Sequence, residues 1–321
     1  MRPVSIGVVL VNWNGPDDTI TCLESLARAR PGPARVIVVD NASTDGSVES
    51  IGHWAERRPE PRPRIVRSDT NLGFAGGTNI GLAELAADPA ITHFLLLNND
   101  ATVDPTFFAA VAAALARVPD AGLLGATIYA GTTRDRVWYA GGRLPGMRAL
   151  TTHGVVIPDH SLVMPTEFVT GCTMLISRGA WETLGPLPEC YFMYFEDAEY
   201  SLRARAAGLP VMYAPGALVQ HADSHTVRRL VPRTRNEYWV TRARVLFVRR
   251  NFQGLVRWRA LAYLTFARSA RAAQRLLTGR PRLAWATLRA LAAGLLAVQD
   301  QLEVPKAGAI QRRRDGVVVE E

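Results

Sequence analysis

The order of segments in the first part of the chain constrains its fold more than any other feature. Short apolar runs alternate with stretches whose apolar residues recur at steps of 3 and 4 residues. The strand-like runs cover residues 4–11, 35–40, 65–66 and 93–97, with a later one at 217–219, and the helix-like stretches cover 16–27, the segment after Gly46, 73–85 and 106–117. This alternation predicts an α/β fold with a mostly parallel sheet covered by helices on both faces. Ligands of such sheets bind at the carboxyl ends of the strands.

Polar residues stand at the ends of several predicted strands. Asp40 ends the second strand, and Asn98, Asn99 and Asp100 follow the fourth. A single aspartate at a strand end is usually a cap or turn residue. Two aspartates at one edge of the sheet can bind sugar or base hydroxyls with one carboxylate and a divalent cation with the other. Asp100 can bind Mg²⁺ or Mn²⁺ that bridges to a phosphate. His221, which follows a later apolar run, is either a structural hydrogen-bond donor or a further cation ligand.

Several glycines between residues 73 and 81 open a predicted helix. They are not spaced G-x-G-x-x-G and do not follow the first strand, which argues against a nicotinamide-dependent enzyme. Glycines at a helix start leave backbone N–H groups available to phosphate or sugar oxygens. They equally allow a helix to pack closely on a sheet, and the sequence leaves both interpretations open.

A second acidic cluster opens another predicted helix. Glu196, Asp197 and Glu199 lie among aromatic residues, and Arg203 follows one turn later. Favourable charge at a helix N-terminus and an i,i+4 pair between Glu199 and Arg203 explain part of this pattern. They explain less well the adjacent acids 196 and 197. Partial burial and like-charge proximity would raise a carboxyl pKa there toward the range of a general base.

The cysteines and the apolar runs bear on the cellular compartment. Cys22, Cys172 and Cys190 are odd in number and have no metal-type spacing, which fits a reducing cytoplasm. The run at residues 4–11 is too short for a signal peptide, and the run at 290–298 is far shorter than the ~20 residues of a membrane span. We therefore expect a cytoplasmic protein.

Charge divides the chain into two parts. Residues 226–321 hold 20 Arg plus Lys against 6 Asp plus Glu, a net +14, whereas residues 1–225 carry a net −6. Only Lys306 is a lysine, so part of the arginine content reflects genome composition. The change of sign predicts a domain boundary near residue 235 and a basic helical extension over 236–321. In that extension Arg257, Arg268, Arg271 and Arg275 share one arc with Leu261 and Leu264, and Leu288, Leu291, Leu295, Val298 and Leu302 form a packing stripe.

Taken in order, these motifs resemble those of the family 2 inverting glycosyltransferases, especially the rhamnosyltransferase-like branch. The resemblance covers residues 4–250 and rests on segments 11–15 (VNWNG), 38–47 (VVDNASTDGS), 71–77 (NLGFAGG), 98–100 (NND), 171–172 (GC) and 195–199 (FEDAE). It implies a GT-A fold over residues 1–235, with a donor half at about 1–125 and an acceptor half at about 126–235.

The resemblance also assigns roles to residues. The donor-binding residues would be Val11, Asn12, Trp13, Asn14, Asp40, Asn41, Asn71, Gly76, Gly77, Asn98 and Asn99. Asp100 and His221 would hold Mn²⁺ or Mg²⁺, Asp197 would be the catalytic base, and Gly171, Cys172 and Glu196 would border the acceptor. The chain departs from the family pattern at Thr78, where Asn is common, and in having one acid in the 98–100 motif. A single acid implies weaker metal binding.

The expected reaction is inverting transfer of a sugar from a nucleotide-diphosphate donor to a hydroxyl of a glycan, a glycolipid or a small-molecule acceptor. By resemblance the first donor to consider is dTDP-rhamnose, with UDP-hexoses and GDP-mannose open. A sugar-nucleotide pyrophosphorylase or a dehydrogenase would not explain the acids at 196 and 197, and a non-catalytic carbohydrate-binding relative would need no base. We expect no nucleic acid partner. The basic helices would contact an anionic membrane at its inner face or a lipid diphosphate, or else form a solvated hairpin or a homodimer interface.

Overall fold

The computed structural model describes residues 3–58, 62–144, 146, 148, 150–222, 230–298 and 317–319. The strands are β1 (Ile6–Asn12), β2 (Arg35–Asp40), β3 (Arg64–Ser68), β4 (His93–Leu97), β5 (Ala101–Val103), β6 (Leu123–Ala130), β7 (Val137–Tyr139), β8 (Gly142–Arg143), β9 (Thr152–His153), β10 (Met164–Pro165), β11 (Thr173–Ser177), β12 (Val211–His221) and β13 (Val317–Val319). The helices are α1 (Pro16–Arg28), α2 (Ser47–Glu56), α3 (Gly73–Ala86), α4 (Phe107–Arg117), α5 (Arg178–Leu184), α6 (Glu196–Ala206), α8 (Arg233–Asn251), α9 (Gly254–Leu277) and α10 (Pro281–Leu295).

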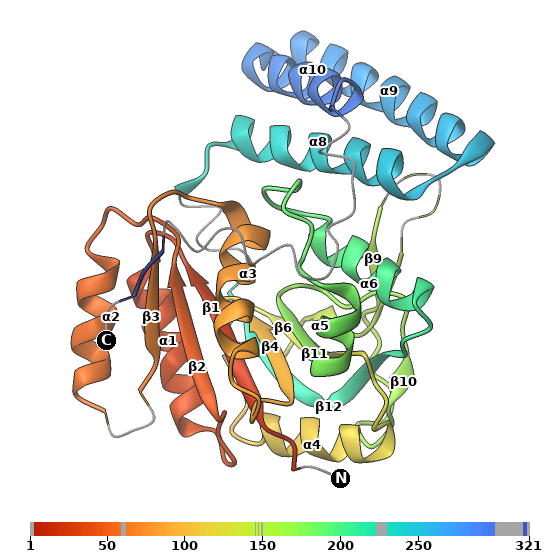
Figure 1. Cartoon of the computed structure of the whole chain (residues 1–321). Helices are drawn as coiled ribbons and strands as arrows, with labels where there is room; N and C mark the ends of the chain where they lie inside the picture. The colour runs from red at the N-terminus through yellow and green to blue at the C-terminus, as the bar shows by residue number, and fades with distance from the viewer. Residues whose placement is uncertain are drawn as a thin grey trace.

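A central sheet organises the described residues (Figure 1). Its main path runs β10-β12-β6-β11-β4-β1-β2-β3-β13. Strands β4, β1, β2 and β3 are mutually parallel, as the alternating pattern predicts, and β6 and β12 are parallel to each other. Strand β11 lies antiparallel between β4 and β6. The register sets Asn12 beside Asp40, so the polar ends of β1 and β2 meet at one edge.

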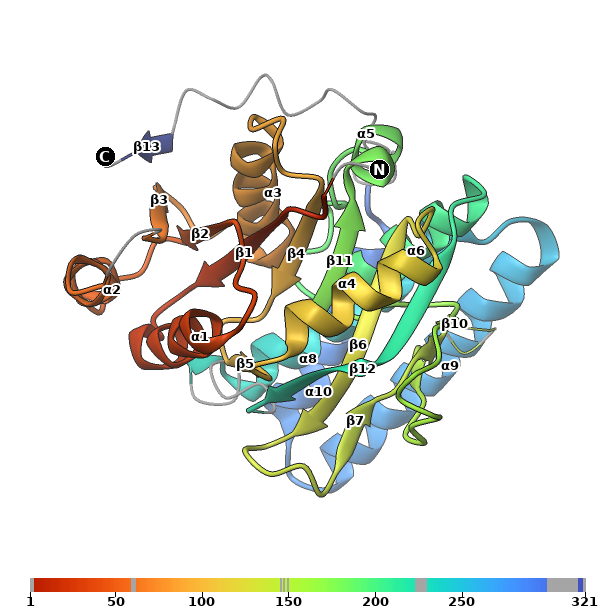
Figure 2. The ribbon, with the colours of Figure 1, turned by 90° about the horizontal axis from the view of Figure 1, so that it is seen from below.

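Helices cover both faces of the sheet. Along β1, Val8 and Leu10 join the core under α1, α2 and α4, whereas Val9 joins the core under α3, α5 and α6. This alternation follows from the two-residue period of a strand, and it explains why the middle of the first strand, Val8 to Leu10, is a continuous apolar run. Figure 2 shows α1 and α4 on one side of the strands and α3 and α5 on the other.

The three C-terminal helices form a further layer over one end of the sheet (Figure 1). Helix α8 is buried from two sides. Its residues Leu246 and Phe247 belong to the main core, and Val245 and Val248 pack with residues of α9 and α10. A Cβ at Gly294 would lie 2.7 Å from the Cβ of Val245, so a glycine allows α10 to approach α8 closely.

Three expectations from the sequence need correction. The predicted short strand at 217–219 is part of the longer β12, because the Pro and Gly within that strand are accommodated by an irregularity between Ala214 and Leu218. The C-terminal part also contributes a strand, β13, which pairs antiparallel with β3 at the sheet edge. The arginine arc of α9 points partly inward, because Arg268 and Arg275 contact Glu237 of α8 at 3.6 and 2.7 Å. Of the helices in the described ranges, none has the length and apolarity that a membrane span needs.

Candidate active site

A cavity of about 380 Å³ opens at the carboxyl ends of β1, β2 and β4. The wall includes these predicted site residues: Val11, Trp13, Asn41, Asn71, Asn98, Asn99, Asp100, Gly171, Cys172, Glu196, Asp197 and His221. Five other predicted residues are not part of the wall: Asn12, Asn14, Asp40, Gly76 and Gly77. The structure thus brings together the ends of four strands and the start of α6, as expected for a ligand site in an α/β sheet.

Asn12 and Asp40 lie directly behind this wall and are almost fully buried. The Asn12 side chain donates to Oδ1 of Asp40 at 2.9 Å, and the backbone N–H of Ser43 donates to Oδ2 at 3.0 Å. Asn14, in the left-handed region at φ 50°, accepts a bond from the N–H of Thr44. These bonds fix the loops after β1 and β2, so the three residues shape the cavity from behind.

The loop before α3 is held by amide side chains. Asn41 donates to Oδ1 of Asn71 at 3.1 Å and to the carbonyl of Gly73 at 2.9 Å. Gly73 has a φ of 72°, and a Cβ there would overlap the carbonyl oxygen of Phe192. At Gly77 a Cβ would come within 2.9 Å of Val11, so this glycine brings α3 close to β1. Of the two interpretations of the glycines, the structure shows close packing of helix on sheet for Gly77, whereas Gly73 lies against the loop at Phe192.

Asp100 and His221 form one polar corner of the cavity. The Nε2 atom of His221 lies 3.1 Å from Oδ1 of Asp100 and 3.3 Å from the side-chain nitrogen of Asn98. The buried Nδ1 atom of His221 has no hydrogen-bond partner within the described part of the chain. Strand pairing explains the proximity, because β5 runs antiparallel to β12 with His221 opposite Ala101.

This corner fits a divalent cation. The Asp100 carboxylate and the Nε2 atom of His221, which lie 3.1 Å apart, are ligands of the types that Mn²⁺ accepts. No group of three or more His, Cys, Asp or Glu side chains with metal-ligand geometry occurs among the residues that the structure describes. A cation here would therefore take its remaining ligands from substrate oxygens.

Asp197 and Glu196 begin α6 on the other side of the cavity. Asp197 accepts hydrogen bonds from the N–H of Gly171 at 2.9 Å and from its neighbour Ala198 at 2.8 Å. Burial raises the pKa of Asp197, and these bonds oppose the rise only in part. Burial and the charge of Asp197 raise the pKa of Glu196 well above its usual range. Its Oε2 atom has no hydrogen-bond partner among the described residues. The pair thus offers one carboxylate that can accept a proton and a neighbour that is readily protonated.

The turn that presents these acids is strained. Tyr194 and Phe195 both lie in the left-handed region, at φ 74° and 72°. Residues other than glycine rarely adopt this conformation, and such strain persists only where the surroundings enforce it. Part of that support comes from Tyr194, whose hydroxyl donates to Asn236 of α8 at 2.7 Å.

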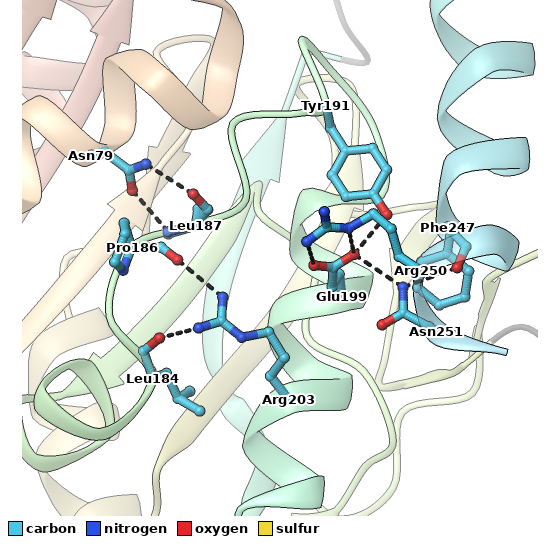
Figure 3. Close-up of polar contacts among 10 residues, drawn as sticks. All are labelled: Asn79, Leu184, Pro186, Leu187, Tyr191, Glu199, Arg203, Phe247, Arg250 and Asn251. Carbon is cyan, nitrogen blue, oxygen red and sulfur yellow. Dashed lines mark hydrogen bonds and ion pairs between the residues drawn. The ribbon is translucent and has the colours of Figure 1, made fainter. Parts of the chain in front are cut away.

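Glu199 differs from the prediction, because it is satisfied mainly from α8 (Figure 3). Arg250 donates to both of its oxygens at 2.6 and 2.8 Å, and Tyr191 and Asn251 donate at 2.7 and 3.0 Å. Although burial raises the pKa of Glu199, its bonds with Arg250 hold that pKa below the ordinary value. Arg203, the expected partner, donates to the carbonyls of Leu184 and Pro186.

One wall of the cavity is aromatic, and most of it escaped the sequence analysis. Phe192 and Trp239 stack with ring centroids 4.5 Å apart, and both line the cavity with Val240. His153 stacks on Phe168 at 5.8 Å. Trp239 and Val240 belong to α8, which begins at Arg233, so the C-terminal helices complete the cavity. A sequence signal existed in the aromatic residues of segment 238–239, but nothing local indicated what they would contact.

A largely parallel sheet covered by helices, with a cavity at the carboxyl ends of its strands, is the architecture of the GT-A fold, which solved glycosyltransferase structures share with this chain. Residues 7–185, more than half of the chain, match the family model for glycosyl transferase family 2. The chain belongs to that family.

Individual relatives agree with this assignment. The chain is 28% identical over 247 residues to an N-acetylglucosaminyl-diphospho-decaprenol L-rhamnosyltransferase of Mycobacterium tuberculosis, covering 69% of this chain and 77% of that protein. It is 22% identical to the low-salt glycan biosynthesis hexosyltransferase Agl10 of Haloferax volcanii, covering 64% and 63%. Among solved structures, the mannosyltransferase PcManGT from Pyrobaculum calidifontis in complex with GDP-Man and Mn²⁺ is similar, with a TM-score of 0.55 and 15% identity over 92% of this chain and 88% of that one. GalNAc-T7 with UDP, GalNAc and Mn²⁺ gives a TM-score of 0.57 and 16% identity over 68% and 44%.

Proposed function

We propose that this glycosyltransferase is metal-dependent and inverting, and that it transfers a sugar to a hydroxyl of a lipid-linked acceptor. One observation carries the proposal: the Asp100–His221 corner and the Asp197 carboxylate line the same cavity. A cation and a base on two walls of one cavity leave room for a nucleotide diphosphate on one side and an acceptor on the other.

Each group has a task in this scheme. Asp100 and His221 would hold Mn²⁺ or Mg²⁺, and a bound cation would neutralise charge that develops on the diphosphate. Asp197 accepts the proton of the acceptor hydroxyl as that oxygen forms its bond to the anomeric carbon. The bond from this carbon to the diphosphate oxygen breaks in the same displacement, which inverts the configuration. A positioned base contributes about 10²–10⁴ to the rate.

Residues around Asp197 assist it. The N–H bonds from Gly171 and Ala198 aim the carboxylate of Asp197 and favour its charged form. The pKa of Glu196 is raised well above its usual range by burial and by the charge of Asp197, and in its protonated form the carboxyl group can donate a hydrogen bond to an acceptor oxygen. Val11, Trp13 and Asn41 line the wall at the ends of β1 and β2, where the nucleotide would bind, and Asn12 and Asp40 support that wall from behind.

The acceptor is the less constrained partner. The aromatic wall of Phe192, Trp239 and Val240 offers an apolar surface to a lipid-linked acceptor. The relative from Mycobacterium tuberculosis is named for such an acceptor and for L-rhamnose. We therefore take dTDP-rhamnose as the first donor, with UDP-hexoses and GDP-mannose as alternatives, and the inner face of the cell membrane as the place of action.

A donor panel tests this proposal. Release of nucleoside diphosphate from dTDP-, UDP- and GDP-sugars is measured with Mn²⁺, with Mg²⁺ and with chelator, in the presence of a short polyprenyl-diphosphate sugar. We expect metal-dependent release from one donor only, highest when the lipid acceptor is present. Release that is unaffected by chelator would contradict the metal assignment. Transfer to a water-soluble glycan but not to the lipid-linked acceptor would contradict the acceptor assignment.

A further inference from the structure

The outward sides of α9 and α10 carry large apolar side chains that nothing in the described chain covers. The α9–α10 face is defined by Leu255, Trp258, Phe266, Leu277, Trp285 and Leu296. Phe266 is 75% exposed, Leu277 89%, and the two tryptophans 62% and 63%. Its four members on α9 lie within an arc of about 100°. Opposite them Leu261 and Leu264 are buried against the other helices.

Both helices contribute to one surface. Helices α9 and α10 pack on each other and on α8, so their exposed sides point away from the catalytic domain (Figure 1). Apolar patches of this kind on a folded domain mark a binding surface more often than an accident of composition. The charge of the residues around the α9–α10 face indicates what kind of partner it binds.

The charge of these helices is of one sign. Between residues 254 and 295 the sequence holds 8 arginines and no acidic residue. Arg268 and Arg275 are used internally by Glu237, but Arg259, Arg282 and Arg289 are exposed. By helical position these three lie on the same side as the α9–α10 face. The surface therefore combines leucines, tryptophans and arginines without a single carboxylate.

This combination disfavours a second copy of the chain. A symmetric interface through the α9–α10 face would set the arginines of one copy against those of the other, with no acidic residue of α9 or α10 to pair with them. An anionic bilayer matches both the positive charge and the apolar side chains of this face, because phosphate headgroups pair with arginine and the boundary with the acyl chains accepts tryptophan and leucine. No described helix can span a membrane, so the contact would lie in the plane of the surface.

We propose that the α9–α10 face binds the surface of an anionic lipid bilayer, with Trp258, Phe266 and Trp285 entering the boundary between headgroups and acyl chains. Helix α8 joins this face to the cavity, since Trp239 and Val240 line the cavity while Val245 and Val248 pack against α9 and α10. One consequence rests on the proposed function: if the acceptor is lipid-linked, docking of the α9–α10 face would hold the cavity next to the membrane that carries the acceptor.

Flotation of the full-length protein with vesicles tests the proposal. Vesicles of phosphatidylcholine alone are compared with vesicles that also contain phosphatidylglycerol, at low and high salt. We expect binding to the anionic vesicles only, weakened by salt. The triple variant Trp258→Ser/Phe266→Ser/Trp285→Ser should lose most of the binding. Each of Arg259→Gln, Arg282→Gln and Arg289→Gln should lower the partition coefficient about fivefold.

The control changes two exposed apolar residues elsewhere, Val155→Ser and Val156→Ser, and should bind as the wild type does. Equal flotation of the triple variant, or no flotation of the wild type with anionic vesicles at low salt, would overturn the proposal. So would a dimer in vesicle-free solution that the triple variant abolishes. Binding is read without turnover, so flotation of a protein that transfers no sugar would refute the proposed function and leave the docking surface intact.

Discussion

The ion pair between Glu199 and Arg250 links α6 directly to α8. Both side chains are 0% exposed, and the guanidinium binds both carboxylate oxygens. Glu199 lies one turn after the acids of the active site, on the same helix. Changing this residue should therefore affect both the stability of the fold and the position of Asp197.

The expected loss of stability in Glu199→Gln follows from the complete burial of Glu199 and Arg250. In Glu199→Gln the volume is kept, but the charge is lost and an amide NH₂ replaces one acceptor, so at least one N–H group of Arg250 loses its acceptor. Removing one partner of a buried ion pair costs about 3–5 kcal/mol, because the other charge stays buried and unpaired. With an m value of about 3 kcal/mol/M, the midpoint of urea unfolding should fall by roughly 1 M or more.

The pKa of Glu199 determines how its contribution to stability changes with pH. The pKa of Glu199 is lower in the folded protein than its ordinary value, so its stabilisation is fully present above the ordinary glutamate pKa. That stabilisation is lost as the pH falls through the folded pKa. The difference in unfolding free energy between wild type and Glu199→Gln should accordingly be constant near neutral pH and shrink in acid.

A matched control is available on the surface. Glu182 lies 3.8 Å from Arg178 and its side chain is 62% exposed, so Glu182→Gln should change stability by less than about 1 kcal/mol. The double variant Glu199→Leu/Arg250→Met should be more stable than Glu199→Gln, because it leaves no buried charge unpaired. If Glu199→Gln unfolds at the same urea concentration as Glu182→Gln, the reasoning about this ion pair is wrong.

Three further predictions concern the active site and can be checked with purified protein. Because burial raises the pKa of Asp197, kcat/KM should rise with pH along an acid limb above the ordinary aspartate pKa of about 3.9, and a rate profile over pH measures it. Asp100→Asn should raise the Mn²⁺ concentration that gives half-maximal turnover by more than roughly 10-fold, because loss of a partner outside the ligand shell already costs about that much. An unchanged Mn²⁺ titration would show that Asp100 does not bind the metal. Gly73→Ala should lower the unfolding free energy by at least about 1–2 kcal/mol, since its φ of 72° and the carbonyl of Phe192 leave no room for a Cβ, whereas Gly179→Ala, where a Cβ would meet nothing, should be tolerated.

Local patterns were enough to predict the alternating strands and helices of the first part of the chain, up to α4. The bounds of β2 and β4 agree with the predicted runs, because a strand buried on both faces needs a continuous apolar sequence. Direction was not predictable in the same way. Strand β11 is as apolar as its neighbours, yet it runs antiparallel between β4 and β6, and no residue in a five-residue strand specifies that.

The candidate site divides along a similar line. Asp100 belongs to one of the ordered motifs, and His221 was placed beside it only by the family resemblance; the two side chains lie 3.1 Å apart although they are separated by 121 positions in the sequence. Arg250 and Trp239 were not predicted, since their importance depends on where α8 packs, and the sequence shows α8 only as part of a basic helical extension. Patterns in the sequence do not predict contacts between distant segments when those segments carry no recognisable motif.

Turnover of Asp197→Asn, measured together with the configuration of the product, tests whether Asp197 is the base of an inverting transfer. We predict that the wild type forms a product whose anomeric configuration, read by NMR, is opposite to that of the donor. We also predict that Asp197→Asn, with unchanged nucleotide binding and an unchanged fold, loses about 10²–10⁴ in kcat. Near-normal turnover of Asp197→Asn, or a product that keeps the configuration of the donor, would contradict this assignment.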